Sequence, residues 1–360
     1  MFPILAQIPS KALFALALLL AVGTALWNVR ARRRNREIPR SSTPLYLVLG
    51  AWLLLGLRGG AWFPSVGIFA EEWKPVPIFA YGVMLGTSMV VGWFLALRLA
   101  EKDGIPREQA GAIYMWTAVW AIIGARVLYV LTELHEFRNP FDVFMLNKGG
   151  LVAYGGMVGG FLASWYGCRK RKIQLLRWAD VSAPSVVLGT GITRVGCLLY
   201  GCDYGRPTDL PWAIRFPPGA PAFHDHVANF GLAQDAAASL PVHPTQIYES
   251  LTGFALFALL MCLRRVRKFS GEVFLGWVIG YGLLRSLIEV YRGDADRGWV
   301  GPLSTSQFIG LLSVVAGVAL LLALLKKHRA DPSSLRFWET PLQTAAPAAA
   351  PRAQRRRHKR

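Results

Sequence analysis

The chain has 360 residues, of which 53% are hydrophobic and 17% charged, and its formal net charge at pH 7 is +19. This composition, with a mean hydropathy of +0.35, excludes an ordinary soluble domain. The positive charge does not indicate nucleic-acid binding, because most of the 40 lysines and arginines lie in short segments between apolar runs. We therefore expect a membrane protein that binds membrane lipids and no nucleic acid.

Apolar runs of about 20 residues are long enough to cross the hydrocarbon core of a bilayer. Nine runs approach this length; the second is short and the fifth is rich in glycine. In chain order they cover residues 11–29, 44–58, 77–99, 112–132, 150–168, 182–200, 246–263, 273–291 and 305–326. The runs predict an all-α polytopic membrane protein with about nine transmembrane helices.

Basic residues concentrate in alternate connections between these runs. The basic connections are residues 30–40, 98–107, 169–177 and 264–268, together with the C-terminal segment 326–360. By the positive-inside rule they face the cytoplasm, so we expect the N-terminus outside and the C-terminus inside. The first run lacks the basic start and the cleavage site of a signal peptide, and we expect it to be retained.

Charged residues inside the apolar runs indicate a site. Arg126, Arg194 and Arg285 lie within predicted membrane helices, where a charge usually faces a cavity or a partner. Arg285 and Glu289 are four residues apart and share a helix face, so they also fit a purely structural pair. Because the arginines outnumber the deep carboxylates, we expect them to bind an anion.

Two further segments lie near the predicted outer face and are each open to two interpretations. The glycines of GGLVAYGGMVGG (149–160) allow close helix packing, and they also leave room for a bulky lipid beside Tyr154. In VHPTQIYES (242–250), Pro244 suits the first turn of a helix. His243 precedes it, either as a structural histidine or as the best candidate general base in the chain.

The spacing of the four cysteines does not indicate a cofactor, and we expect none. Cys197 and Cys202 lie near the outer face, where they either form a disulfide or remain free thiols. No CxxC pair or histidine cluster indicates a metal, and we expect none.

Seven segments form an ordered set between about Ile78 and Leu325: FAYGVMLG (79–86), GARVLYV (124–130), GGLVAYGGMVGG (149–160), ADVSAP (179–184), TRVGCLLYGCDYGRPTDLPWAIRFP (193–217), HPTQIYES (243–250) and YGLLRSLIEVYRGD (281–294). In this order they resemble the prolipoprotein diacylglyceryl transferases. The resemblance implies transfer of a diacylglyceryl group from phosphatidylglycerol to the lipobox cysteine of a prolipoprotein signal peptide, with release of glycerol phosphate. It also implies an active site at the outer face of the bacterial cytoplasmic (inner) membrane.

The resemblance also implies roles for individual residues. Arg194 corresponds to the arginine that binds the phosphatidylglycerol head, and Arg285 to an essential arginine of the penultimate helix. The expected catalytic residues are Arg194, Arg285, His243 and Tyr154. The expected substrate-binding residues are Tyr81, Arg126, Gly155, Gly156, Asp203, Gly205, Glu249, Glu289 and Arg292.

Three positions depart from the family pattern. Tyr154 stands where many members have a histidine that has been favoured as the base, and tyrosine is a poorer base at neutral pH. Cys197 replaces a frequent asparagine, and Cys202 replaces a frequent glutamate beside Asp203. These departures leave open a non-catalytic or substrate-altered paralogue that binds lipid or lipoprotein. A lipid transporter is the other alternative, because arginines and glycine-rich helices could also line a translocation path.

The predicted organisation has three parts. Residues 1–76 form an added N-terminal membrane hairpin, and residues 77–326 form a seven-helix transferase core with an outer loop at 201–245. Residues 327–360 form a basic, disordered cytoplasmic tail, which either lies on anionic lipid heads or is simply solvated.

Overall fold

The computed structural model describes residues 4–8, 76–137, 143, 150–293, 298–333 and 335–336. The first two predicted membrane helices and most of the basic tail lie outside the described residues. The described part is mainly helical.

Seven long helices correspond to the last seven apolar runs. They are α3 (Ala80–Lys102), α4 (Arg107–Thr132), α5 (Ala153–Lys170), α6 (Leu175–Tyr200), α8 (Thr245–Val266), α9 (Glu272–Glu289) and α10 (Thr305–Ala330). Five of them, α3, α4, α6, α8 and α10, are long and apolar enough to cross a membrane. The predicted all-α fold of a multi-pass membrane protein is thereby confirmed.

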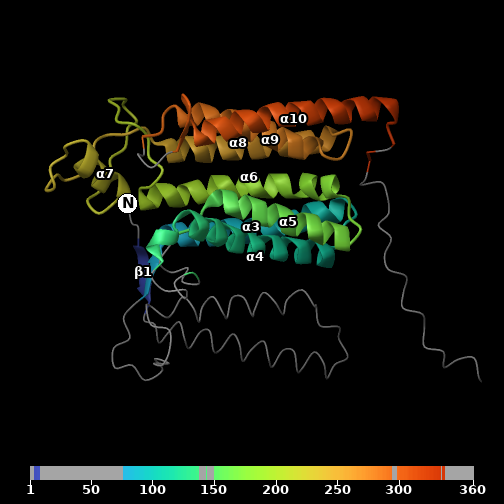
Figure 1. The fold of residues 1–360 in the computed structure, drawn as a ribbon, viewed down its shortest axis with the longest axis horizontal. Coiled ribbons are helices and arrows are strands. Elements are labelled where there is room, and N and C mark those ends of the chain that lie inside the picture. The colour runs from blue at the N-terminus through green and yellow to red at the C-terminus, as the bar shows by residue number, and fades with distance from the viewer. Residues whose placement is uncertain are drawn as a thin grey trace, which may run out of the picture.

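Helix α6 lies between two groups of helices (Figure 1). Helices α3, α4 and α5 are on one side of it, and α8, α9 and α10 are on the other. Glycines bring α4 and α5 together, because a Cβ on Gly155 would overlap the carbonyl of Gly124, and one on Gly159 would overlap that of Trp120. The close-packing interpretation of the segment 149–160 is therefore correct for these glycines.

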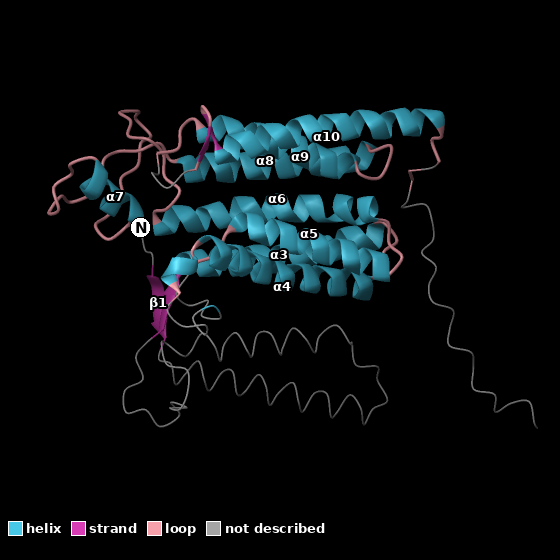
Figure 2. Cartoon of the chain, in the orientation of Figure 1, coloured by secondary structure: helices cyan, strands magenta, loops and turns pink. Residues whose placement is uncertain are grey.

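Shorter elements gather at one end of the bundle. Helix α7 (Pro221–Asn229) belongs to the long loop between α6 and α8 and lies at the same end as β1 (Figure 2). Strand β1 (Ile4–Ile8) pairs antiparallel with β2 (Val76–Phe79), and β3 (Trp299–Val300) pairs with β4 (Leu303–Ser304). A one-turn 3-10 helix, η2 (Leu134–Glu136), follows α4. The apolar runs did not predict these strands, because segments of two to five residues are too short for a hydropathy pattern.

The other end of the bundle is closed by buried ion pairs. The Asp103 carboxylate lies 2.6 Å from both Arg264 and Arg267, and Arg177 donates to the Asp103 carbonyl at 2.8 Å. The Asp180 carboxylate accepts backbone N–H bonds at the start of α9, each of 2.9 Å. These contacts explain why α6 begins at Leu175 although the corresponding apolar run begins at 182. The first turns of α6 contain charged side chains, which can be buried because they are paired with opposite charges and hydrogen-bonding groups.

Candidate active site

A cavity of about 330 Å³ opens beside the last turns of α6. Helices α3, α6 and α9 and the turn after α6 form its walls. Its lining residues are Tyr81, Thr190, Thr193, Arg194, Cys197, Asp203 and Tyr281. The cavity therefore contains two of the charged residues expected at the site, with threonine and tyrosine hydroxyls around them.

The end of α6 shapes this cavity. Gly201 has a φ of 87°, and the N–H groups of Gly201 and Cys202 both donate to the Cys197 carbonyl, at 2.8 and 3.2 Å. Glycine favours this left-handed conformation and ends the helix with a tight turn. Thr245 then donates to the Asp203 carbonyl and Gln246 to the Cys202 carbonyl, each at 2.7 Å. The turn is thus fixed to the start of α8.

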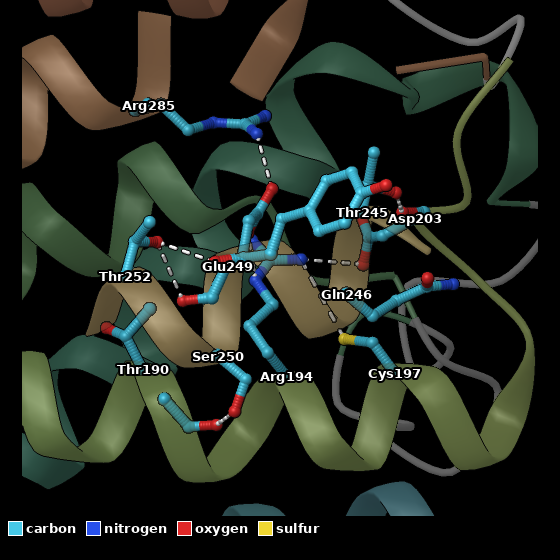
Figure 3. A network of polar contacts seen from close by, with 12 residues as sticks. Thr190, Arg194, Cys197, Asp203, Thr245, Gln246, Glu249, Ser250, Thr252 and Arg285 are labelled. Carbon is cyan, nitrogen blue, oxygen red and sulfur yellow. Dashed lines mark hydrogen bonds and ion pairs between the residues drawn. The ribbon is translucent and has the colours of Figure 1, made fainter. Parts of the chain in front are cut away.

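Arg194 is held by two carboxylates from separate elements (Figure 3). Its Nη1 lies 2.9 Å from Asp203 Oδ2, and its Nε forms an ion pair with Glu249 Oε2 on α8. Glu249 also lies 2.7 Å from Arg285 Nη1, and Arg285 Nη2 lies 2.9 Å from Glu289 on the same helix. Glu249 therefore joins α6 to α9 through two arginines.

Arg292 completes the cluster. Its Nη2 lies 2.6 Å from Asp203 Oδ1, and its Nη1 lies 3.5 Å from Glu249. Three arginines thus face three carboxylates, which corrects the expected surplus of cations at this position. The expectation failed because the tight turn after α6 directs the Asp203 carboxylate back to Arg194, and because Arg126 lies outside the cluster.

Asp203 stays ionised in this cluster. Its burial alone would raise its pKa, but the Arg194 and Arg292 guanidinium groups hold that pKa below its usual value. Asp203 also has a φ of 57°, an uncommon conformation for a residue with a side chain. The turn therefore places a fixed negative charge beside Arg194.

His243 lies in a separate aromatic group next to the cluster. Its Nδ1 is 3.4 Å from the Tyr248 hydroxyl, which accepts from Trp212 Nε1 at 2.8 Å, and its ring centroid is 5.1 Å from that of Tyr291. His243 is not among the residues that line the cavity. A Cβ on Gly205 would lie 2.5 Å from the His243 carbonyl, so Gly205 serves close backbone packing here.

The remaining predicted site residues lie on α4 and α5. Tyr154 is in the first turn of α5, 37% exposed, and does not line the cavity. Gly155 and Gly156 face α4, with a Cβ on Gly156 reaching 3.2 Å from the Ala121 carbonyl. Arg126 donates to the carbonyls of Val143 (2.8 Å) and Gly150 (3.0 Å). The structure therefore does not bring these four residues into the ion cluster.

Thr190, Thr193 and Tyr281 line the cavity but were not predicted. Each lies four residues before another member of the site, namely Arg194, Cys197 and Arg285. Residues four apart share a helix face. The four-residue spacing that relates Arg285 to Glu289 could therefore have identified these three residues from the sequence.

The loop above the site contains a buried histidine. His226 on α7 has no exposed surface, its Nδ1 accepts from the Leu240 amide at 3.2 Å, and its ring packs against Tyr204 and Phe230. Burial lowers the pKa of His226 below its ordinary value of 6.5. The folded loop thus favours the neutral ring.

We expect acidification to loosen this loop. Because the folded-state pKa is lowered, the stabilisation is present above about pH 6.5 and is lost as pH falls from there through the folded-state pKa. Hydrogen exchange at the Leu240 amide should quicken between pH 7.5 and 5 after correction for intrinsic exchange. The exposed neighbour offers a control, since His224→Gln should keep this response and His226→Gln should weaken it. An unchanged response in His226→Gln would contradict the assignment.

Comparison with known proteins shows the family of this chain. A family model described as prolipoprotein diacylglyceryl transferase matches residues 68–323. The phosphatidylglycerol–prolipoprotein diacylglyceryl transferase of Clostridium tetani is 32% identical over 243 residues, covering 67% of this chain and 91% of that protein. Those of Finegoldia magna and Bacillus cereus (strain 03BB102) are 31% and 30% identical, covering 68% and 74% of this chain and 90% and 96% of their own lengths. With more than two thirds of its length matched in this way, the chain belongs to the prolipoprotein diacylglyceryl transferase family.

Proposed function

We propose that this protein transfers a diacylglyceryl group from phosphatidylglycerol to the cysteine thiol of a prolipoprotein and releases glycerol phosphate. The relatives compared above have names that state this activity. The observation that carries the proposal is Arg194, which lines a 330 Å³ cavity while two carboxylates hold it in position.

Arg194 is suited to bind a phosphate. Its Nε contacts Glu249 and its Nη1 contacts Asp203, so Nη2 has no hydrogen-bond partner among the described residues. In this proposal Nη2 donates to the phosphate of the lipid head. The carboxylates keep the guanidinium plane fixed, and a donor fixed in advance stabilises developing charge without reorganising during the reaction.

The proposed reaction is a substitution at one carbon, in which a carbon–sulfur bond replaces a carbon–oxygen bond. The prolipoprotein sulfur attacks a glycerol carbon of phosphatidylglycerol, and the carbon–oxygen bond to the phosphate breaks. Glycerol phosphate leaves with the electron pair, and Arg194 and Arg285 stabilise its charge. Cys197 lines the cavity but is not a covalent carrier in this scheme, because a thioether on Cys197 would be as stable as the product.

The thiol must lose its proton before or during the attack, because the thiolate is the nucleophile. Tyr154 and His243 remain the proposed bases. Neither lines the cavity, so in this proposal the bound peptide presents its cysteine between the cavity and one of them. Tyr154 in place of histidine is also the observation that favours a non-catalytic, substrate-binding paralogue as the second candidate.

The proposed setting is the outer face of the bacterial cytoplasmic membrane, with the C-terminus in the cytoplasm. The ion cluster and the loop with α7 are at one end of the bundle, and Arg177, Arg264 and Arg267 are at the other. The basic connections 98–107, 169–177 and 264–268 all lie at that other end, and this bias fits the positive-inside rule. We further propose a core at 77–326, an added membrane hairpin at 1–76, a basic tail at 327–360, and prolipoprotein signal peptides with a lipobox as partners.

A lipid-binding experiment tests the proposed substrate. The detergent-solubilised protein should retain phosphatidylglycerol in native mass spectrometry in preference to zwitterionic phosphatidylcholine. Arg194→Ala should lose the preference, while Arg107→Ala should keep it, because Arg107 is exposed at the far end of the bundle. Equal retention of the two lipids by the unaltered protein would count against phosphatidylglycerol as the substrate.

A further inference from the structure

Two cysteines meet at the end of α6. The left-handed Gly201 closes the helix, and the Cys202 amide donates to the Cys197 carbonyl at 3.2 Å. In this type of helix cap, the side chains of those two positions come into contact. The Cys197 and Cys202 sulfurs and an Asp203 carboxylate oxygen all lie within 4.8 Å of one another. All four cysteines of the chain are free.

The surroundings give the two sulfurs different chemistry. Arg194 Nη1 donates to Cys197 Sγ at 3.8 Å, so the Cys197 sulfur is a hydrogen-bond acceptor. The Cys202 thiol donates to Asp203 Oδ2 at 3.6 Å. A hydrogen bond with Cys197, burial and the charge of Asp203 together raise the pKa of Cys202. The Cys197 sulfur thus accepts a hydrogen bond, whereas the Cys202 thiol donates one beside it.

The cavity lies directly beside this pair. Cys197 is among its lining residues although only 3% of Cys197 is exposed, and Cys202 is partly exposed. Cys168, by contrast, lies in the apolar core at the opposite end of α5. In reversible thiol pairs a second cysteine lies beside the attacking one.

We propose that Cys197 and Cys202 form a reversible disulfide that switches off the anion site. The Cys197 thiolate attacks one sulfur of a small-molecule disulfide and expels a thiolate. Cys202 then gives up its proton, and its sulfur attacks Cys197 Sγ and expels a second thiolate. The pair loses two electrons and two protons, and the small disulfide becomes two thiols.

The disulfide changes the contacts of Arg194. Cys202 can no longer donate to Asp203, and Cys197 Sγ is drawn from Arg194 Nη1 toward Cys202. Both changes affect groups that contact the guanidinium directly. We therefore expect weaker binding of a phosphate in the cavity. This effect on transfer rests on the proposed function, whereas formation of the bond does not.

The bond is tested in a Cys168→Ala/Cys262→Ala protein, which keeps only the pair. The protein is treated with oxidised glutathione, quenched in acid, denatured and labelled with a maleimide. Intact mass should show two labels on the reduced monomer, none on the oxidised monomer, and two again after treatment with dithiothreitol. With Cys202→Ser added, the reaction should stop at one glutathione on Cys197. With Cys197→Ser added, the first attack on oxidised glutathione should not occur. Two labels on the oxidised monomer, or a disulfide-linked dimer, would overturn the proposal.

Transfer is measured on portions of these samples that are taken before the acid quench and freed of glutathione. Oxidation should lower the rate about tenfold, and dithiothreitol should restore it. The Cys197→Ser/Cys202→Ser protein should not respond to glutathione. If the disulfide forms and the rate is unchanged, the switch is wrong. If the reduced protein transfers nothing while the bond still forms, the proposed function fails instead.

Discussion

Glu249→Ala is expected to abolish transfer and to lower the thermal stability of the bundle. Glu249 is 6% exposed and forms ion pairs with Arg194, Arg285 and Arg292. Without the Glu249 carboxylate, the buried guanidinium groups lose a negative charge that they share. Breaking a buried ion pair typically lowers the free energy of unfolding by about 3–5 kcal/mol. Thermal unfolding in detergent and the initial rate of transfer measure the two effects.

Two variants separate the contributions at this position. Glu249→Gln keeps the size of the side chain but loses its charge, so it should unfold at a temperature between those of Glu249→Ala and the unaltered protein. Glu101→Ala removes an exposed carboxylate paired with Arg107 at 3.2 Å and should change stability by less than about 1 kcal/mol. If Glu249→Ala unfolded and reacted like Glu101→Ala, the central place of Glu249 would be wrong.

Arg194→Ala is expected to lower kcat/KM for phosphatidylglycerol by about a thousandfold. Loss of one fixed donor to a developing oxyanion commonly reduces a rate by about 10² to 10³. Here the same side chain also binds the lipid phosphate in our proposal. The rate is measured over a series of phosphatidylglycerol fractions in liposomes.

Arg194→Lys should recover only a small part of this loss. An ammonium group cannot make the planar, several-point contacts by which a guanidinium binds Glu249, Asp203 and a phosphate together. Thermal unfolding serves as the check on folding in each variant. A folded Arg194→Ala protein with unchanged kcat/KM would show that the phosphate is bound elsewhere.

The sequence predicted much of the fold because membrane helices have a strong signal. The last seven apolar runs correspond to the seven long helices of the described residues. Helix starts were less accurate, since α4 begins at Arg107 and α6 at Leu175, several residues before their apolar runs. Both first turns carry charged or polar side chains, which hydropathy excludes from a span.

The site was predicted in part. Arg194, Arg285 and Glu289 were predicted because charges are rare in apolar runs, and Glu249 was predicted from the resemblance to the family. The structure brings these four residues into one cluster. Only the pairing of Arg285 with Glu289 was foreseen from spacing. The other ion pairs depend on how α6, α8, α9 and the turn at Asp203 meet in space.

Arg126 lies apart from this cluster. It satisfied the same rule as a charge inside an apolar run, but its hydrogen bonds go to the carbonyls of Val143 and Gly150. A charged residue can enter a membrane helix in order to fix a neighbouring segment, and sequence spacing does not distinguish that case from a ligand site.

Reconstituted transfer tests the central claim most directly. The protein in phosphatidylglycerol liposomes is given a lipobox peptide, and glycerol phosphate release is compared with the mass of the peptide. We predict one released glycerol phosphate for each diacylglyceryl group gained, with both lost in Arg285→Ala. Peptide that stays bound and unmodified, with no glycerol phosphate released by the folded protein, would contradict the proposed activity and favour a non-catalytic paralogue.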